Sequence, residues 1–248
     1  MLYLISLGLY EMKDMSVKAL ETARACDALY LEMYTTRMNL DEKRLTNFIG
    51  KPVKQLSREE IEDGKRILQE ATKKDVGLLV GGDALVATTH TSLILDAKKA
   101  GVQVQVIHGS SIYSAIGETG LQLYKFGKTT TLAYSEDNYK PTSFYETIQQ
   151  NKKSGLHTLV LLDVKADKNR FMTVKEGLKT ILEVEKEKKG KIISEDTKVV
   201  AVCQLGGDQR IKYAKVKTLM KENPENTPAV LIITGELHFL EKEYLEGL

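Results

Sequence analysis

Short apolar runs alternate with amphipathic stretches along the first half of the chain. Apolar side chains dominate residues 2–7 and 28–33, and both runs have the length of a strand. Between them, residues 15–26 carry apolar side chains at helical spacing, and we expect Asp14 to cap the free N–H groups of that helix. A further helix is expected over residues 58–73. Strands separated by helices predict an α/β fold whose sheet is at least partly parallel.

The pattern changes beyond Gly127, where residues 129–133 form a run of β-branched side chains that predicts a strand. After it we expect three more strands, at residues 158–164, 198–204 and 229–234, and two helices, at residues 143–153 and 174–188. This change predicts a second domain. We therefore expect two α/β domains with mixed sheets flanked by helices, over residues 1–112 and 113–248.

Residues 76–120 follow the order strand, turn, helix, strand, turn, helix, and both turns are rich in glycine. The first turn holds Gly-Gly-Asp at 81–83 and the second holds Gly-Ser-Ser at 109–111. Parallel strands joined by crossover helices point their carboxyl ends to one edge, where ligands bind. The N–H groups of a following helix can also receive a polar ligand there. The stretch predicts a small-molecule pocket, with glycines that merely reverse the chain direction as the alternative interpretation.

Composition narrows the classes of ligand. The chain has 248 residues, 42% of them hydrophobic, which is enough for a substantial core. Its 36 basic and 34 acidic residues leave a formal charge of +2, so we expect no nucleic acid partner. No run approaches the roughly 20 apolar residues that cross a bilayer. The amino terminus has no basic leader or small-residue cleavage site, so we interpret it as a strand of a compact cytoplasmic protein.

Residue types that bind metals or act as nucleophiles show no catalytic spacing. Cys26 and Cys203 stand far apart without a Cys-x-x-Cys pair, which favours two buried thiols in a reducing compartment. The four histidines form no His-Glu-x-x-His motif, and neither glycine-rich turn is a Gly-x-Ser-x-Gly elbow. We therefore expect no metal site and interpret the histidines as structural, and hydrolytic chemistry is unsupported.

Two nucleotide-binding motifs are incomplete. Gly8 stands alone after the first strand, where a dinucleotide site needs Gly-x-Gly-x-x-Gly, so Glu32 is interpreted as an ordinary strand-end carboxylate. Residues 127–129 are Gly-Lys-Thr, like the end of a phosphate loop, but Gln122 replaces the glycine that such a loop requires. Neither motif supports a phosphate site.

Several longer segments resemble one known family nearly end to end. They are LISLGLYEMKDMSVKALETARACDALYLEMYTT, GGDALVATTH, HGSSIYSAIGETGLQLYKFGKTTTLAY, PTSFYETI, GLHTLVLLDVKA and GELHFLEKEYL. The chain resembles the diphthine synthase family, in the tetrapyrrole-methylase-like group of S-adenosylmethionine-dependent methyltransferases. The segment IYSAIGETGLQLYKFGKT separates this family from the members of the group that act on porphyrins.

The resemblance implies a two-domain tetrapyrrole-methylase-like fold with the methyl donor, S-adenosyl-L-methionine, in the cleft between the domains. It also implies a homodimer and repeated methylation of one amino group. The substrate in this family is translation elongation factor 2, whose modified histidine is trimethylated on its way to diphthamide. The compact length of the chain favours an archaeal member of the family.

The resemblance also assigns the donor contacts by position. They would be Leu9, Asp83, Val86, Ser111 and Ile112 from the first half of the chain, and Leu162, Leu205 and Val230 from the second. The family's usual Gly-Asp-Pro turn reads Gly-Asp-Ala here because Ala84 replaces the proline. A second departure is the run CQLGGD at 203–208, where the family has Ala-Arg-Ala-Gly. No catalytic residue is assigned, and Glu118 is interpreted as a surface or cap residue.

Two other functions stay open at this point. A Gly-Gly-Asp turn after an apolar strand also occurs in nucleotide-dependent kinases, although Ala84 stands where their motif continues with glycine. The departures at Ala84 and at residues 203–208 also fit a homologue that binds the donor or elongation factor 2 without turnover. Binding of ATP would favour the first function, and donor binding without product would favour the second.

Overall fold

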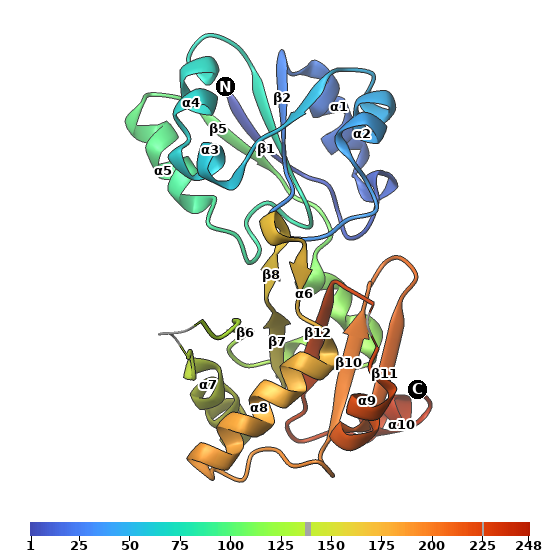
Figure 1. Cartoon of the computed structure of the whole chain (residues 1–248). Helices are drawn as coiled ribbons and strands as arrows, with labels where there is room; N and C mark the ends of the chain where they lie inside the picture. Colours follow the sequence, from blue (N-terminus) through green and yellow to red (C-terminus); the bar gives the residue numbers. More distant parts are fainter. Residues whose placement is uncertain (137–139, 225) are drawn as a thin grey trace. The chain divides into compact units, whose positions relative to one another are not determined.

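The chain divides into two compact units in the computed structural model, which describes residues 1–136, 140–224 and 226–248 (Figure 1). The first unit contains residues 1–115 and 165–169, and the second contains residues 116–164 and 170–248. Each unit has its own five-stranded sheet. The domain boundary expected between residues 112 and 113 stays a prediction. In the described ranges, no helix is long and apolar enough to cross a membrane.

All five strands of the first sheet are parallel, in the order β3-β2-β4-β1-β5. The strands are β1 Leu2–Ser6, β2 Ala28–Glu32, β3 Val53–Gln55, β4 Val76–Val80 and β5 Val104–Ile107. In the register of the sheet, Leu2 lies opposite both Val76 and Val104. The expected parallel α/β sheet is confirmed, and short apolar runs suit strands that are covered on both faces.

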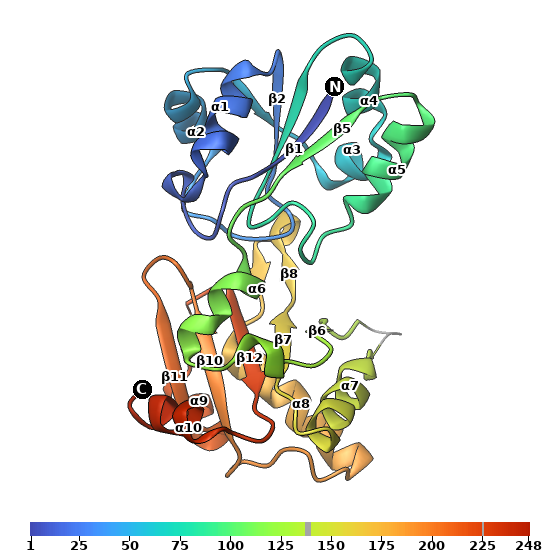
Figure 2. The same cartoon turned by 180° about the vertical axis from the view of Figure 1, so that it is seen from behind.

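Helices cover both faces of this sheet (Figures 1 and 2). On one side lie α1 (Val17–Ala25) and α2 (Glu42–Ile49), and on the other lie α3 (Arg58–Asp63), α4 (Lys65–Ala71) and α5 (Thr91–Lys99). Successive side chains of a strand point to opposite faces. Leu4 accordingly packs with α4 and α5, whereas Ile5 packs with α1 and α2.

The cap of α1 differs from the expectation. Ser16, not Asp14, caps the helix, and its hydroxyl accepts a hydrogen bond from the N–H of Ala19 at 3.1 Å. The Asp14 carboxylate instead accepts from the N–H groups of Tyr10 and Glu11, in the turn that precedes the helix. The two candidate caps stand two residues apart, so spacing alone did not separate them.

The helix expected over residues 58–73 is two helices, α3 and α4. Gly64 separates them because it adopts a left-handed conformation with φ of 64° and ends α3. A Cβ atom at this position would lie only 2.8 Å from Cδ1 of Leu93, so α5 also packs close to the break. The amphipathic pattern continues across the glycine, which explains why it predicted a single helix.

The second unit has a mixed sheet in the order β11-β10-β12-β7-β6. Its strands are β6 Thr130–Leu132, β7 Thr158–Leu162, β10 Lys198–Cys203, β11 Arg210–Lys215 and β12 Ala229–Ile233. The pair β6 and β7 is parallel, and the other neighbouring pairs are antiparallel. A separate two-stranded sheet joins β8 (Val164–Lys165) to β9 (Arg170–Phe171). The four expected strands are confirmed, and β11 was not expected.

One face of this mixed sheet carries the core of the second unit. The helices that cover it are α7 (Ser143–Lys153), α8 (Val174–Lys188) and α9 (Val216–Glu222) (Figure 1). Leu178 and Ile181 of α8 pack there with Leu231 of β12. The two helices expected in this half are confirmed. The other helical segments of the described second unit are α10 (Phe239–Glu246), η2 (Ile116–Thr119) and η3 (Leu123–Lys125). The first unit also contains α6 (Ile112–Ala115), η1 (Met12–Asp14) and η4 (Ala166–Lys168).

A buried carboxylate attaches α10 to the rest of the second unit. Glu241 is fully buried and accepts hydrogen bonds from Lys125 Nζ at 2.6 Å and from the N–H of Gln122 at 2.9 Å. His157 Nδ1 accepts from the N–H of Gly235, so the imidazole proton resides on Nε2, which donates to Glu241 at 3.1 Å. The bonds from Gln122 and Lys125 join α10 to a segment more than 110 residues earlier in the chain, and His157 lies 84 residues before Glu241.

Candidate functional site

The connections of the first sheet reverse direction between β1 and β4. These strands are neighbours, yet the chain leaves β1 toward β2 on one side and leaves β4 toward β5 on the other. Open parallel sheets bind ligands beyond the carboxyl ends of the strands at such a point. The Gly-Gly-Asp turn at 81–83 follows β4, and the Gly-Ser-Ser turn at 109–111 follows β5. Both turns therefore lie at the edge of the sheet where a ligand is expected.

Two glycines hold the ends of β1 and β4 together. The N–H of Gly8 donates to the carbonyl of Gly82 at 3.1 Å, and the N–H of Gly82 donates to the carbonyl of Gly8 at 2.7 Å. Their φ angles of 84° and 71° lie in the region that favours glycine. A Cβ on Gly8 would lie 2.6 Å from the carbonyl oxygen of Asp14, whereas one on Gly82 would meet no atom within 4 Å. Gly82 therefore borders open space.

Asp83 is held in one orientation beside that space. Its side chain is buried, and its Oδ1 accepts a hydrogen bond from the N–H of Leu85 at 3.0 Å. Its Oδ2 accepts from His108 Nδ1 at 2.8 Å and from the N–H of Gly109 at 3.2 Å. Burial acts to raise the pKa of Asp83, but these hydrogen bonds outweigh it and lower the pKa. Asp83 is therefore a fixed, ionised carboxylate at neutral pH.

Two residues around Asp83 were missed by the sequence analysis. His108, which was interpreted only as structural, donates to the carboxylate of Asp83 from a largely exposed side chain. Ser6 is fully buried at the end of β1, and its hydroxyl accepts a hydrogen bond from the N–H of Ala84 at 2.9 Å. Ser6 is a polar residue near the carboxyl end of an apolar run, and His108 directly follows one. That position is the signal that would have identified them.

The Gly-Ser-Ser turn differs in detail from the expected anion-binding helix start. Ser111 is buried, and its N–H donates to the hydroxyl of Ser114 at 3.0 Å, so this N–H group is already paired. The helix that follows, α6, has only four residues. The N–H of Gly109 is also paired, with Asp83, so two N–H groups of this turn are not free to bind a ligand.

The assigned donor contacts of the first unit are of two kinds. Asp83 and Ser111 are buried polar residues, whereas Leu9, Val86 and Ile112 are half-buried apolar residues. Leu9 follows the β1 turn, Val86 follows the β4 turn and Ile112 follows the β5 turn. The polar and apolar members thus belong to turns at the same edge of one sheet. Their role as donor contacts stays a prediction.

The three contacts assigned in the second unit do not share one face of its sheet. Leu162, at the end of β7, belongs to the core of the second unit, and a Cβ on Gly177 of α8 would lie 2.8 Å from its Cδ2 atom. Val230 stands between Ala229 and Leu231, which both belong to that core cluster, so its side chain points to the opposite face. Leu205 is buried in the turn after β10. Their role as donor contacts also stays a prediction.

Glu118 lies on the surface, as expected. Its side chain is exposed, and its carboxylate accepts a hydrogen bond from Gln209 Nε2 in the turn that follows β10. Its carbonyl oxygen accepts from the hydroxyl of Tyr244 at 3.1 Å. Glu118 therefore connects η2 to two neighbouring segments of the second unit, which is a structural role.

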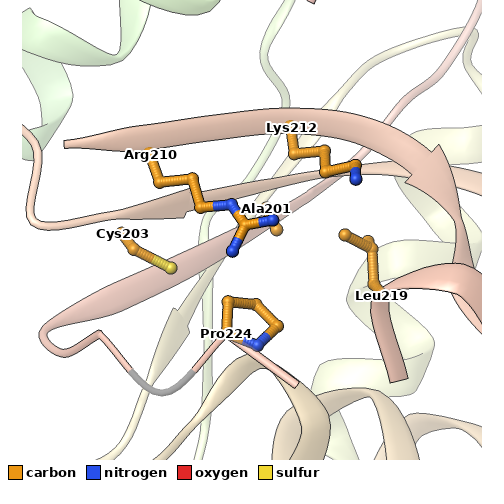
Figure 3. A pocket seen from close by; sticks show the side chains of 6 residues that line it. All are labelled: Ala201, Cys203, Arg210, Lys212, Leu219 and Pro224. Atoms are coloured by element: carbon orange, nitrogen blue, oxygen red, sulfur yellow. The ribbon is translucent and has the colours of Figure 1, made fainter. Parts of the chain in front are cut away.

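A small hollow in the second unit is lined by two basic side chains whose charges are already paired with a carboxylate. It is lined by Ala201, Cys203, Arg210, Lys212, Leu219 and Pro224 (Figure 3). Glu222 already binds both cations, with Oε2 at 2.9 Å from Arg210 Nη2 and Oε1 at 2.5 Å from Lys212 Nζ. Burial raises the pKa of the Cys203 thiol to about 11, which leaves it unreactive at neutral pH. The hollow is therefore a poor candidate for an active site.

Metal ligands do not gather in the part of the chain that the structure describes. There, no group of three or more histidine, cysteine, aspartate or glutamate side chains is placed to hold a metal ion. Cys26 and Cys203 are both buried and free, as expected. The chemistry of the candidate site thus rests on the Asp83 carboxylate and the apolar residues beside it.

Known proteins match this chain over its full length. The family of tetrapyrrole (corrin/porphyrin) methylases matches residues 1–232. Diphthine synthase from Methanocaldococcus jannaschii is 44% identical, and the match covers 100% of this chain and 98% of that protein. Among solved structures, a candidate diphthine synthase from Entamoeba histolytica superimposes with a TM-score of 0.93 at 38% identity, covering 99% of this chain and 97% of that one. A diphthine synthase structure gives 0.90 at 32% identity, covering 99% and 94%. The chain therefore belongs to the tetrapyrrole methylase family, in its diphthine synthase branch.

Proposed function

We propose that this chain is an S-adenosylmethionine-dependent methyltransferase that acts on translation elongation factor 2, as a diphthine synthase. The observation that carries the proposal is the fixed Asp83 carboxylate at the switch point of the sheet, in a chain that matches diphthine synthases throughout. The reaction adds three methyl groups to the amino group of the modified histidine, on the way to diphthamide. Because the substrate is a translation factor, we place the reaction in the cytoplasm.

The residues at the strand ends suit S-adenosylmethionine as the donor. Asp83 offers carboxylate oxygens that can accept hydrogen bonds from hydroxyl or ammonium groups. Gly82 leaves open space beside it for the atoms of a ligand. Leu9, Val86 and Ile112 are half-buried apolar residues, which suit an adenine ring or a methionine chain. These residues would hold the donor.

Methyl transfer requires the protein mainly to align the acceptor amine with the methyl group of the donor. Bound S-adenosylmethionine supplies a methyl group on a positively charged sulfur. An amine with a pKa of about 8 is already partly neutral at physiological pH, so the acceptor needs little help to lose its proton. Asp83, held by three hydrogen bonds, provides a fixed point for orienting the reactants. Positioning therefore provides most of the catalysis, and no general base is assigned.

We also propose that two copies of the chain associate. The segment 118–125 lies against α10, because Tyr244 donates to the carbonyl of Glu118 and Glu241 accepts from the N–H of Gln122. Large apolar side chains are exposed on these two segments, namely Leu123, Tyr124, Phe239, Leu240 and Tyr244. Such a patch is typical of an interaction surface. Light scattering after size exclusion should give the mass of a dimer, and a monomer at micromolar concentration would contradict association.

Calorimetric titration tests the donor site directly. The protein is titrated with S-adenosylhomocysteine and, separately, with ATP, and both titrations are repeated on Asp83→Ala. The matched control is Asp96→Ala, which changes an exposed aspartate of α5 whose carboxylate pairs with Lys99 of the same helix. We expect binding of S-adenosylhomocysteine that Asp83→Ala weakens and Asp96→Ala leaves unchanged. Binding of ATP alone would favour the kinase.

Turnover is the second test. Elongation factor 2 that carries the unmethylated precursor is incubated with the protein and S-adenosylmethionine, and its mass is followed by mass spectrometry. We expect up to three additions of one methyl group each. Tight binding of S-adenosylhomocysteine with no change in the mass of the factor would favour a homologue that binds without catalysing.

A further inference from the structure

The carbonyl oxygen of Ala84 accepts two side-chain hydrogen bonds from the turn that follows it. Thr88 Oγ1 donates at 2.8 Å, and His90 Nδ1 lies at 3.0 Å. Both acceptor positions of that carbonyl are thus occupied, which is the most a backbone oxygen normally accepts. Ala84 and His90 are both buried. The side chains of Thr88 and His90, in the sequence Ala-Thr-Thr-His, therefore hold the segment 84–90 folded back onto the carbonyl of Ala84.

The hydrogen bond to Ala84 identifies which nitrogen of His90 is the donor. A carbonyl oxygen only accepts hydrogen bonds, so Nδ1 of His90 carries a proton. The other nitrogen, Nε2, lies 3.9 Å from Oε2 of Glu32, at the end of β2. With the proton on Nδ1, this second nitrogen is an acceptor, and it is buried without a hydrogen-bond partner among the residues that the structure describes.

Glu32 is itself held rigidly at the end of β2. Its Oε1 accepts from the N–H groups of Tyr34 at 2.6 Å and Thr35 at 2.8 Å. Its Oε2 accepts from the hydroxyl of Thr35 at 2.6 Å. Glu32 is thus a buried strand-end carboxylate, as expected. Its Oε2 lies 3.9 Å from Nε2 of His90, so the end of β2 packs close to the turn that carries Asp83 without a hydrogen bond to it.

We propose that His90, assisted by Thr88, is a positioning residue for the methyl donor. This inference rests on the proposed function, because it concerns the same site. Asp83 directly precedes Ala84, so the path of the peptide after Asp83 decides where its carboxylate stands. Ser6 binds the N–H of Ala84 and His90 binds its carbonyl, so the peptide groups on both sides of this residue are fixed. His90 thus acts on the donor site indirectly, by fixing the peptide group that follows Ala84.

The expected effect is on donor affinity rather than on the chemical step. When the hydrogen bond from His90 is lost, the turn samples other conformations, and the apparent dissociation constant rises as the competent fraction falls. One hydrogen bond of ordinary strength corresponds to a loss of about 5- to 10-fold in affinity. Once the donor saturates the site, the turn is held by the ligand, so kcat should change little.

Three variants test this role. His90→Leu removes the donor, whereas His90→Asn keeps an N–H group at about the position of Nδ1. Ser92→Ala is the matched control, because Ser92 lies in the same helix start but binds the carbonyl of Thr89. The dissociation constant for S-adenosylhomocysteine and the KM and kcat for S-adenosylmethionine are measured well below the unfolding temperature. We expect His90→Leu to weaken binding about 5- to 10-fold, and His90→Asn to stay within about twofold of the parent chain.

The outcomes separate this inference from the proposed function. If the parent chain fails to bind S-adenosylhomocysteine, the proposed function is wrong. If the parent binds and His90→Leu binds equally well, the positioning role is wrong. A fall in kcat at saturating donor with unchanged affinity would also contradict it. Should His90→Leu not fold, Thr88→Val removes the other bond to Ala84 from a half-buried position, and unchanged affinity in that variant overturns the proposal.

Discussion

The N–H of Ala84 donates a hydrogen bond of 2.9 Å to the hydroxyl of Ser6, which joins the turn after β4 to the end of β1. Ser6 is fully buried, so a lost donor would leave a polar atom without its partner away from water. Proline, which the resemblance to diphthine synthases leads us to expect at position 84, has no N–H and cannot make this bond. The alanine of this chain therefore adds a link between two strand ends.

Ala84→Pro should destabilise this protein, although it introduces the residue that the resemblance leads us to expect. Loss of the hydrogen bond to a buried acceptor lowers the free energy of unfolding by about 1–3 kcal/mol. Proline also restricts the unfolded chain, which raises that free energy by only about 0.4–1 kcal/mol. We expect a net loss of about 1 kcal/mol in the free energy of unfolding, measured in urea. In a Ser6→Ala background the bond is already absent, so the same change should be neutral or stabilising. Equal losses in both backgrounds would show that Ser6 is not the cause.

Gly109→Ala should weaken donor binding by displacing a partner of Asp83. A Cβ at this position would lie 2.8 Å from Cβ of Ser6, so the backbone must move, and its N–H bonds to Asp83 at 3.2 Å. We expect the dissociation constant for S-adenosylhomocysteine to rise about tenfold. Gly117→Ala is the control, since its Cβ would lie 3.8 Å from Cγ of Leu123, which is an ordinary contact, and its φ is not positive. An unchanged dissociation constant in Gly109→Ala would exclude this contact from donor binding.

The sequence pattern predicted the elements that bury a continuous apolar run or face. β1 and α8 are examples, because residues 2–5 of β1 form an unbroken apolar run and α8 has an unbroken apolar face that packs into the core of the second unit. The pattern missed α2, β11 and α10, which are short and in which at least half of the residues are polar. Such elements are stabilised by contacts with distant segments, as Glu241 shows for α10. Local periodicity carries no record of contacts made across the fold.

The candidate site was predicted in part for a similar reason. Asp83 could be singled out because glycines and an apolar strand precede it directly in the chain. His108 contacts it from 25 residues away and Ser6 contacts the next residue from 78 residues away, and no local motif joins these positions. Their proximity follows from the strand order, in which β1 lies between β4 and β5. Strand order was not deducible from the apolar pattern.

Neither cysteine should react with a thiol reagent while the protein is folded. Burial raises the pKa of both the Cys26 and Cys203 thiols to about 11, so the reactive thiolate is scarce at neutral pH, and both side chains are inaccessible. Ellman's reagent at pH 8 should detect no fast-reacting thiol in the native protein and two in guanidinium chloride. One rapidly titrating equivalent in the native protein would mean that a cysteine is exposed, and Cys26→Ala would identify which.

The stability of the second unit should fall in acid because of Glu241. Burial acts to raise the pKa of Glu241, but hydrogen bonds from Lys125, the backbone and His157 outweigh it and lower the pKa from 4.5 to about 2. A carboxyl group whose pKa is lower in the folded state stabilises the fold above its unfolded pKa. This stabilisation is lost as the pH falls from about 4.5 toward 2. The window lies below that of any histidine with an ordinary pKa.

Glu241→Gln isolates this contribution from the other carboxylates that titrate in acid. The glutamine removes the charge and turns an N–H₂ group toward donors that include Lys125 Nζ and His157 Nε2, so we expect lower stability at neutral pH. The difference from the parent chain should shrink steadily as the pH falls below 4.5, because protonation removes the same charge from Glu241. Glu243→Gln, at an exposed position of the same helix, should show no such trend. A difference that stays constant between neutral pH and pH 3 would mean that the charge of Glu241 does not hold α10 in place.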